Sequence, residues 1–532
     1  MPDRSPGDWF LTAAQRGNPA SDLPAFAAGN AVDVLIHGAA YFDALAAEVA
    51  ALGAGDHLFF TDWRGDPDER MRPEGPTVRE VFTAAARRGV VVKGLVWRSH
   101  LDTLQFSEEE NQHLGEAIEQ AGGEVLLDQR VRLGGSHHQK MVLLRRPGDP
   151  VADVAFVGGI DLCHSRRDDA DHAGDPQAVR MNPRYGDRPP WHDLQLRIRG
   201  PAVAALDTTF RERWRDRAGV DTNSPLAWLV DRIRRADMTA GPLPEQPPPP
   251  PPAGPHAVQV LRTYPDGRRV YDFAPRGERS IARGYTKALR NARRLIYLED
   301  QYLWSRQVAE LVAAALRANP DLHLVAVVPR YPDVDGRLSL TANLVGRQQA
   351  LEVCRRADPA RVHVYDVENH RGTAVYVHAK VCVIDDVWAC AGSDNFNRRS
   401  WTHDSELACA VLDETRDPRE PRDPAGTGDG ARVFARDLRL ALLREHLDRA
   451  PDGSQDDGLI DPGAAVAALD AAAAGLDDWY AGGRCGPRPP GRLRRHRPER
   501  IGRLRRLWSV PVYRTVYDPD GRSWRDRLAG RW

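Results

Sequence analysis

The stretch His378-Ala379-Lys380, with Asp385 behind it and then Gly392-Ser393-Asp394-Asn395-Phe396-Asn397, decides the fold. An earlier stretch reads much the same: His138-Gln139-Lys140, followed by Ala155-Phe156-Val157-Gly158-Gly159-Ile160-Asp161. A single His-x-Lys triplet carries little information. Two copies, each with a small-residue turn behind it, predict one active site that is assembled from two similar halves of the chain.

The spacing of each triplet has a chemical meaning. Residues i and i+2 of a strand share a face, so His138 and Lys140 point the same way, as do His378 and Lys380. An imidazole beside an ammonium favours an anion between them, and a phosphodiester is such an anion. Two lysines can stabilise its charge, while one histidine attacks phosphorus and the other protonates the leaving oxygen. The four residues are therefore predicted to be catalytic.

The turns behind the triplets are predicted to bind substrate. Glycine lets the backbone and a ligand approach closely, and serine and asparagine side chains can donate to a phosphate oxygen. The residues expected at the substrate are Gly159, Asp161, Ser393 and Asn395.

Both triplets resemble the HxKxxxxD signature of the phospholipase D superfamily. The second copy matches it in full, which adds Asp385 to the predicted site, although this aspartate is usually structural in the family. The first copy departs from the signature, because Arg145 stands where the aspartate should be. Asp149 and Asp153 follow in an expected hairpin tip and are candidates to replace it.

The resemblance also implies partners and roles for the histidines. In the family, an acidic residue after the turn orients each imidazole. By position, Glu406 is expected beside His378, and Asp168 beside His138, with Asp169 as the alternative. The N-terminal motif usually supplies the nucleophile, so the resemblance assigns the attack to His138 and protonation of the leaving group to His378.

Further segments resemble the phospholipase D branch of the superfamily: Gly158 to Cys163 with Arg166-Arg167-Asp168-Asp169, Pro190-Trp191-His192-Asp193, and Ile296-Tyr297-Leu298-Glu299-Asp300-Gln301-Tyr302, with Phe60-Thr61-Asp62-Trp63 as the first-half analogue of the last. The resemblance implies a phosphodiesterase that hydrolyses glycerophospholipids, or transfers their phosphatidyl group to an alcohol, through a phosphohistidine intermediate and without a cofactor. A phosphatidyltransferase of the cardiolipin synthase type and a superfamily nuclease use the same four residues and are the alternatives. The intact triplets disfavour a scaffold without activity.

Strands that alternate with helices predict an α/β fold, and the resemblance implies two pseudo-symmetric α-β-α sandwich halves that share one cleft. The predicted domains are a first half at 1–240, a proline-rich linker at 241–255, a second half at 256–415 and a C-terminal extension at 416–532. The predicted strands are 32–36, 57–61, 90–97, 124–127, 194–198, 258–261, 295–298, 323–328 and 362–365. The predicted helices are 41–52, 77–88, 107–121, 202–217, 280–291, 306–318, 341–357 and 464–476.

The composition bounds the partners. The 532-residue chain has a formal net charge of −1 and a pI near 7.0, so no global basic field predicts nucleic acid binding. No apolar run reaches the ~18–20 residues of a membrane span, and no secretory signal is visible. We therefore expect a cytoplasmic monomer that acts on phospholipid, with peripheral contact to the membrane surface. Residues 484–506, with ten arginines and one acid, are a candidate for docking on anionic headgroups, with internal pairing as the alternative.

Cysteines and histidines outside the triplets give no metal prediction. Cys163, His164, His172 and His192 are metal-binding residue types, but their spacing matches no standard zinc pattern, so polar packing in a loop is expected. The six cysteines lack paired spacing and are expected to be reduced, with Cys382 and Cys390 as core residues.

Overall fold

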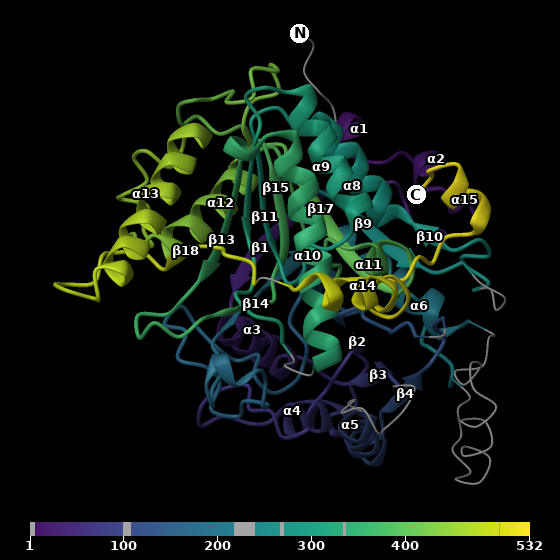
Figure 1. The fold of residues 1–532 in the computed structure, drawn as a ribbon. Helices are drawn as coiled ribbons and strands as arrows, with labels where there is room; N and C mark the ends of the chain where they lie inside the picture. The colour runs from purple at the N-terminus through teal and green to yellow at the C-terminus, as the bar shows by residue number, and fades with distance from the viewer. Residues whose placement is uncertain are drawn as a thin grey trace.

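The computed structural model describes residues 6–98, 108–132, 134–216, 240–266, 271–333, 337–499 and 501–532. Strands from both halves of the chain join in one 16-stranded sheet (Figure 1). Its order is β18-β13-β12-β11-β15-β16-β17-β9-β1-β8-β6-β5-β2-β3-β4, with β10 beside β9. Strands β1 (Ala27–Ile36) and β9 (His256–Tyr264) meet antiparallel, so the two halves share a continuous sheet.

The main strands and helices follow the same order in both halves, whereas the short elements differ. After α1 (Pro6–Trp9) and α2 (Ala13–Arg16), the first half consists of β1, α3 (Gly38–Ala50), β2 (His57–Asp62), α4 (Val78–Arg87), β3 (Val91–Trp97), α5 (Glu108–Gln120), β4 (Glu124–Asp128), β5 (Met141–Arg145), β6 (Val154–Gly158), β7 (Trp191–His192), β8 (Leu194–Arg199) and α6 (Ala202–Trp214). The second half consists of β9, β10 (Glu278–Arg279), α8 (Ser280–Asn291), β11 (Leu295–Asp300), α9 (Arg306–Ala318), β12 (His323–Val327), α10 (Arg337–Ala357), β13 (Val362–Val367), β14 (Tyr376–Val377), β15 (Lys380–Ile384), β16 (Trp388–Gly392), α11 (Arg398–Thr402) and β17 (Glu406–Asp413), and α12 (Val433–His446) follows at the start of the C-terminal extension. The repeat confirms the predicted pseudo-symmetry.

Alternating side chains along the strands divide the core into two faces. In β2, Phe59 packs on the face covered by α6, whereas Leu58 and Phe60 pack on the face covered by α3, α4 and α5. In β15, Val381 joins the first of these faces and Cys382 packs against α8 and α9 on the other. The sheet is therefore buried between helices on both sides, which is the predicted α-β-α arrangement.

The proline-rich linker runs along the first half, and Arg145 anchors it. Arg145 is fully buried, with Nε 2.7 Å from Asp153 and Nη1 2.8 Å from Asp207. Its Nη2 donates to the carbonyl of Pro248 over 2.6 Å. Asp153 thus pairs with Arg145, the residue that replaces the signature aspartate. In this chain the signature position holds the linker in place.

The C-terminal extension packs on the second half through α12 and α13 (Pro462–Ala481), and β18 (Leu493–Arg495) pairs with β13 at the sheet edge. Arg492 and Arg494 pair with Asp448 and Asp477, so internal pairing accounts for part of the arginine-rich segment. The C-terminal extension continues through α14 (Arg503–Val512) and α15 (Trp524–Leu528). In the part of the chain that the structure describes, no helix is both long and apolar enough to cross a bilayer.

Candidate active site

Each triplet lies where the chain enters an inner strand of its half. His138 and Lys140 directly precede β5, while His378 lies just before β15 and Lys380 begins it. Burial lowers the pKa of both imidazoles well below the usual range, and the positive charges of both lysines lower each of them further. Each ring is thus within electrostatic reach of the lysines of both triplets.

A short strand pair holds the second triplet against the opposite half, and an isolated parallel bridge between His137 and Ser405 does the same for the first. β14 ends next to His378 and runs parallel to β7, and the N–H of His378 donates to the carbonyl of His192 over 2.8 Å. In the equivalent place, the N–H of His138 donates to the carbonyl of Ser405 over 2.9 Å. The residues that follow these two carbonyls are both acidic. These two backbone contacts therefore bring an acid of each half to the histidine of the other half.

These acids orient the histidines. His138 Nδ1 lies 2.9 Å from Glu406 Oε2, and His378 Nδ1 lies 2.6 Å from Asp193 Oδ2. The predicted pairing is wrong: Glu406, expected beside His378, orients His138, and His378 is oriented by Asp193, which was not predicted. Asp168, expected beside His138, orients neither histidine. Both carboxylates are fully buried. Because the Nδ1 atoms are engaged, the Nε2 atoms are the ring nitrogens left for a substrate.

Asp168 shapes a loop instead. Its Oδ2 accepts the N–H of Trp191 over 2.8 Å, and its Oδ1 accepts the N–H groups of Gly174 and Asp169 over 3.1 and 3.0 Å. Asp169, the alternative, is exposed. The prediction took an acid that soon follows the Gly-Gly turn, but a long loop separates that turn from the strand that meets the second triplet.

The sequence contains a signal for Asp193. Each orienting acid stands directly before a leucine whose carbonyl binds the small-residue turn of its own half. Gly159 donates its N–H to Leu194 over 3.2 Å, and Ser393 donates its N–H to Leu407 over 2.9 Å. Aligning the two halves on the acid-leucine pair, and not on distance from the turn, identifies Asp193.

Lys140 is buried among charged groups. Its Nζ lies 3.3 Å from Asp161 Oδ1 and donates to the carbonyl of His138 over 3.1 Å. Arg166 lies 3.4 Å from the other oxygen of Asp161 and covers the ring of Trp191. Burial alone would raise the pKa of Asp161, but Lys140 and Arg166 lower it overall. Asp161 therefore stays ionised and balances two cations of the centre.

Lys380 makes the equivalent backbone contact, donating to the carbonyl of His378, and also donates to Gln301 Oε1 over 3.2 Å. Burial lowers the pKa of Lys380 to about 8. Unlike Lys140, it has a neutral amide as its side-chain partner, so its ammonium is the more available to an incoming anion.

The small turn residues make room for the acids. A Cβ added to Gly159 would lie 2.2 Å from an oxygen of Asp193, so only glycine fits there. Ser393, at the matching position, donates its hydroxyl to Glu406. The Asn395 Oδ1 is buried without a hydrogen-bond partner among the described groups. Substrate contact by these residues stays a prediction.

Asp385 is placed away from the histidines. Its carboxylate accepts the N–H groups of Arg293, Arg294 and Leu295 over 2.7, 2.8 and 2.8 Å. These bonds fix the entry to β11, so the signature aspartate acts on the fold and not on the reacting atoms.

Asp62 and Asp300 show how closely the halves correspond. Asp62 ends β2 and accepts the N–H of Leu162 over 2.8 Å, and Asp300 ends β11 and accepts the N–H of Phe396 over 2.8 Å. Each bond ties the turn behind a triplet to the neighbouring strand. The predicted equivalence of the two segments is borne out by these matching contacts.

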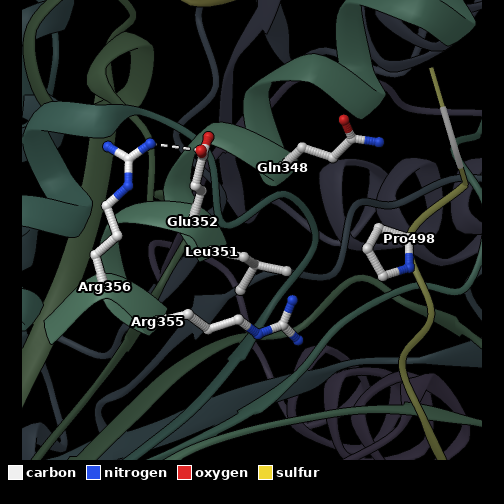
Figure 2. A pocket seen from close by; sticks show the side chains of 6 residues that line it. All are labelled: Gln348, Leu351, Glu352, Arg355, Arg356 and Pro498. Atoms are coloured by element: carbon white, nitrogen blue, oxygen red, sulfur yellow. Dashed lines mark hydrogen bonds and ion pairs between the residues drawn. The ribbon is translucent and has the colours of Figure 1, made fainter. Parts of the chain in front are cut away.

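Two pockets lie near the second half. An open hollow of about 400 Å³ on α10 is lined by Gln348, Leu351, Glu352, Arg355, Arg356 and Pro498 (Figure 2), and none of these residues belongs to the reaction centre. A smaller pocket is lined by Gln301, Tyr302 and Tyr376, among others. It adjoins the centre, because Gln301 is the side-chain partner of Lys380.

The fold and the site define a class of proteins in which two α/β halves each give one His-x-Lys triplet to a shared centre. Comparison with known families agrees: a model described as "Phospholipase D" matches residues 70–310, and one described as "Cardiolipin synthase, PLD-like domain" matches residues 285–417. The chain belongs to the phospholipase D superfamily, and its similarity is to the phospholipase D branch.

Individual relatives are distant. The chain is 25% identical over 509 residues to phospholipase D alpha 1 of Cynara cardunculus, which covers 73% of this chain and 60% of that protein. It is 25% identical over 500 residues to phospholipase D alpha 1 of Vigna unguiculata, covering 71% and 59%. The crystal structure of phosphatidylserine synthase from Haemophilus influenzae Rd KW20 superposes with a TM-score of 0.51 at 13% identity, covering 76% of this chain and 86% of that one. The chain thus spans about three-fifths of the curated relatives it matches, and the solved structure supports the fold alone.

Proposed function

We propose that the chain is a phospholipase D-like phosphodiesterase that acts on glycerophospholipids as a monomer. One observation carries the proposal: two imidazoles, each oriented by an acid of the opposite half, share one buried centre with two lysines. The names of the relatives are consistent with this reaction class. The proposal includes a cytoplasmic location, which the six free cysteines support.

The reaction proceeds in two displacements. In the first, the lone pair of His138 Nε2 forms a bond to phosphorus, the bond to the headgroup oxygen breaks, and His378 gives its proton to that oxygen. In the second, His378 takes a proton from water, the water oxygen bonds to phosphorus, and the bond to His138 breaks. The products are phosphatidic acid and the free headgroup. Lys140 and Lys380 stabilise the charge on the non-bridging oxygens.

The hydrogen bonds of the two acids support this assignment of roles. Glu406 Oε2 is shared between His138 and the hydroxyl of Ser393, while Asp193 Oδ2 takes His378 alone and at the shorter distance. An unshared carboxylate at 2.6 Å stabilises an imidazolium more than a shared one at 2.9 Å. His378 is therefore the ring more readily protonated, which suits proton transfer to the leaving oxygen, and His138 is the ring more readily left neutral, which suits attack on phosphorus.

Phosphatidyl transfer to an alcohol is a second candidate. The match of residues 285–417 to a cardiolipin synthase-type domain favours it. Transfer uses the same intermediate on His138 and differs only in the acceptor of the second step.

Product analysis on mixed phospholipid tests both proposals. With water alone we expect phosphatidic acid, and with added ethanol we expect phosphatidylethanol. His138→Ala and His378→Ala should each abolish both products, whereas Asp169→Asn, which alters an exposed carboxylate in the neighbouring loop, should not. Cleavage of oligonucleotides without any lipid product would support the nuclease alternative and refute the lipid proposal.

Trapping the intermediate tests the roles. An activated ester such as a p-nitrophenyl phosphodiester needs little protonation of its leaving group, so His378→Asn should form the adduct and release it slowly. Intact mass after rapid quench should show one phosphoryl group on the peptide that contains His138. An adduct on His378 in the reciprocal His138→Asn variant, with none on His138, would reverse the assignment.

We also propose that the C-terminal segment contacts the membrane surface. Leu507, Trp508, Trp524 and Leu528 on α14 and α15 are 76%, 39%, 67% and 81% exposed. Arg399, which follows the second turn, donates to the carbonyl of Val516 and to that of Gly134, which lies just before the first triplet. The exposed apolar side chains therefore lie on a segment that is tied by hydrogen bonds to the loops next to the two triplets.

The contact is tested with Leu507→Ser/Leu528→Ser and, as a matched control, Val151→Ser, which alters an apolar side chain that is 69% exposed on a distant hairpin. Losing two leucines from a lipid interface costs about 3 kcal/mol or more. We expect turnover on anionic vesicles to fall at least ~10-fold in the double variant and to be unchanged on a short-chain soluble substrate. Equal loss on both substrates would show that the segment serves the fold instead.

A further inference from the structure

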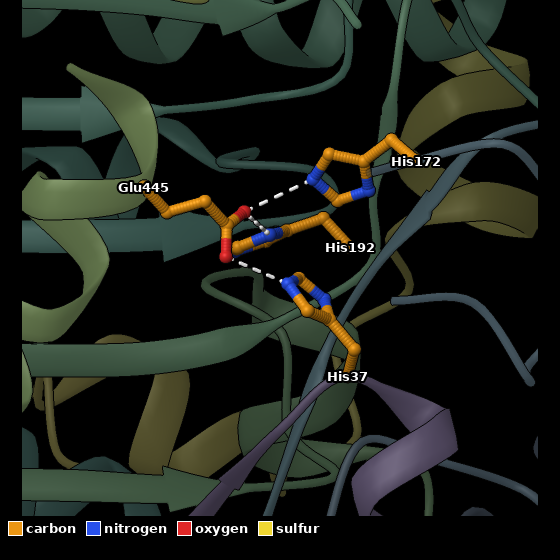
Figure 3. A group of neighbouring side chains, drawn as sticks. All are labelled: His37, His172, His192 and Glu445. Atoms are coloured by element: carbon orange, nitrogen blue, oxygen red, sulfur yellow. Dashed lines mark hydrogen bonds and ion pairs between the residues drawn. The ribbon is translucent and has the colours of Figure 1, made fainter. Parts of the chain in front are cut away.

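Four side chains converge behind the reaction centre from segments that are far apart in the sequence (Figure 3). His37 precedes α3, His172 lies in the loop before β7, His192 belongs to β7, and Glu445 belongs to α12. A ring nitrogen of each histidine and a carboxylate oxygen of Glu445 all lie within 4.8 Å of one another. The imidazoles are buried and the Glu445 side chain is 10% exposed. Four atoms of metal-binding type thus surround one point inside the protein.

Glu445 is the common partner of the three rings. His37 Nε2 lies 2.7 Å from its Oε2, while His172 Nε2 and His192 Nδ1 lie 3.0 and 3.3 Å from its Oε1. In a tetrahedral zinc site with bonds of about 2.0–2.1 Å, neighbouring donor atoms lie about 3.3 Å apart. The separations from Glu445 are therefore close to those of atoms that share one ion.

The opposite nitrogens of two rings are already committed. His172 Nδ1 faces the carbonyl of Trp191 at 3.1 Å, and His192 Nε2 faces the carboxylate of Glu299 at 2.6 Å. These oxygens accept hydrogen bonds, so the nitrogens that face them carry the protons. The remaining nitrogen of each ring faces Glu445, and this contact requires either a second proton on the ring or a cation between the ring and the carboxylate. Metal-binding histidines are typically oriented by such carbonyl and carboxylate partners.

His37 completes the set. Its Nδ1 is buried without a hydrogen-bond partner among the described groups, so the contact of Nε2 with Glu445 is what holds the ring. His37 and His172 also have positive φ angles, 68° and 51°, which are uncommon for residues other than glycine. Two of the three rings are thus presented by backbone in an unusual conformation.

We propose that His37, His172, His192 and Glu445 bind one divalent transition-metal ion of the zinc type. Neutral imidazole and carboxylate are donors that zinc accepts in four-coordinate sites. All four positions are filled by the protein, which is the arrangement of a structural site, and none is left open for a substrate.

The ion fastens α12 of the C-terminal extension to β7 and to the start of α3. β7 also supports the reaction centre, because the carbonyl of His192 accepts the N–H of His378 over 2.8 Å and the next residue is Asp193. The proposed hydrolysis needs no metal at phosphorus, so the ion is a separate inference that stands or falls by itself.

The expectation from sequence grouped His172 and His192 with Cys163 and His164 and predicted no metal. In the structure His164 does not belong to the cluster of His172 and His192. Its Nδ1 lies 3.3 Å from Asp66 Oδ2 and its Nε2 lies 3.0 Å from Asp68 Oδ1. The partners that complete the set, His37 and Glu445, lie too far away in the sequence for any spacing rule to find them.

The test is metal binding by the full-length protein, purified without a metal-binding tag and stripped with a chelator. We expect one Zn²⁺ per chain by elemental analysis after dialysis, and Co²⁺ in its place should give the intense visible absorption of a tetrahedral complex. Glu445→Gln and His37→Asn should weaken binding by more than about 100-fold. His164→Asn, a neighbouring histidine outside the set, should bind as the wild type does.

Wild-type protein that takes up neither ion at micromolar concentration would overturn the proposal and leave doubly protonated rings as the explanation. Tight binding that survives both Glu445→Gln and His37→Asn would overturn it as well, because the ion would then lie elsewhere. The Co²⁺ spectrum of the wild type decides the question even if a variant fails to fold. Activity is measured in neither arm, so the outcome is independent of the proposed function.

Discussion

Single residues carry the chemistry here through partners that lie in the other half of the chain. His138 depends on Glu406 and His378 on Asp193, and an amide in place of either acid keeps the shape but removes the charge that holds Nδ1–H. We expect Glu406→Gln and Asp193→Asn each to lower kcat by about 10²- to 10⁴-fold, as for a lost general acid or base. Steady-state rates on a short-chain soluble phospholipid measure the effect.

Asp168→Asn is the matched control for these variants. Asp168 accepts backbone N–H groups, and the amide oxygen of asparagine can still accept them. We expect its kcat to stay within about tenfold of the wild type, well short of the loss of an acid–base group. If Asp168→Asn proved as damaging as Glu406→Gln, orientation across the halves would not be the controlling feature.

Lys380 should set the alkaline limit of activity. Burial lowers its pKa to about 8, and only the ammonium form stabilises negative charge on phosphorus oxygens. Above pH 8 the free enzyme loses this proton, so kcat/KM should fall about tenfold per pH unit. In Lys380→Arg the guanidinium stays charged, so the rate should be low but level over the same range. An identical alkaline limb in both proteins would assign it to another group.

Among the elements, the long helices were the easiest to predict. The ranges predicted for α8 and α9 agree with the structure at both ends, because a regular apolar stripe and polar flanks mark them. The two-residue strands β7 and β14 were missed, since two residues show no periodicity and each strand needs a partner from the other half. The wrong assignment of Asp168 follows directly from that omission, because β7 delivers Asp193 to its histidine.

Arg145, the last residue of β5, is expected to contribute strongly to stability. Arg145→Ala leaves Asp153 and Asp207 buried without their cation and releases the carbonyl of Pro248. We expect the free energy of unfolding to fall by about 3–5 kcal/mol, with kcat unchanged in the folded protein because Arg145 is remote from phosphorus. Denaturant unfolding followed by fluorescence measures the loss.

Arg72→Ala is the control for Arg145→Ala, since Arg72 forms a surface pair with Asp43 in which both side chains are about half exposed. Such pairs contribute about 0–1 kcal/mol. A loss of similar size in both variants would mean that the buried arginine does not anchor the linker.

At the scale of the whole molecule, we expect stability to fall in acid because of Glu278, whose carboxylate joins the N-terminal segment to the second half. Burial opposes ionisation of Glu278, but Arg262 at 2.6 Å and Arg16 at 3.0 Å outweigh it and lower the pKa from 4.5 to about 2. A lowered carboxyl pKa stabilises the fold above the unfolded value of 4.5, and this contribution is lost as the pH falls from 4.5 toward 2. It amounts to about 3 kcal/mol.

Unfolding free energies of the wild type and Glu278→Gln, compared between pH 6 and pH 3, isolate this contribution. The difference between the two proteins should be largest at pH 6 and should shrink as the pH falls. Glu310→Gln, which alters an exposed pair, should follow the wild type at every pH. A difference that stays constant with pH would show that Glu278 acts by packing alone.

The duplicated triplets were enough to predict two similar halves, but not how the halves join. The continuous sheet through β1 and β9 depends on an antiparallel contact that includes an irregular register between Ala27 and Asn30, which no periodic pattern records. The cluster around Glu445 depends on four segments meeting in space. Local order could therefore be predicted from local sequence, whereas contacts between the halves required the structure.

The meeting of β1 with β9 has the form of a contact between two copies of one subunit. In a symmetric homodimer every substitution occurs twice, so two equivalent histidines cannot be made permanently different. A fused chain is free of that constraint, and here the matching positions have diverged: Gly159 against Ser393, Asp161 against Asn395, and Arg145 against Asp385. Fusion thus gives evolution a way to assign attack to one histidine and proton transfer to the other.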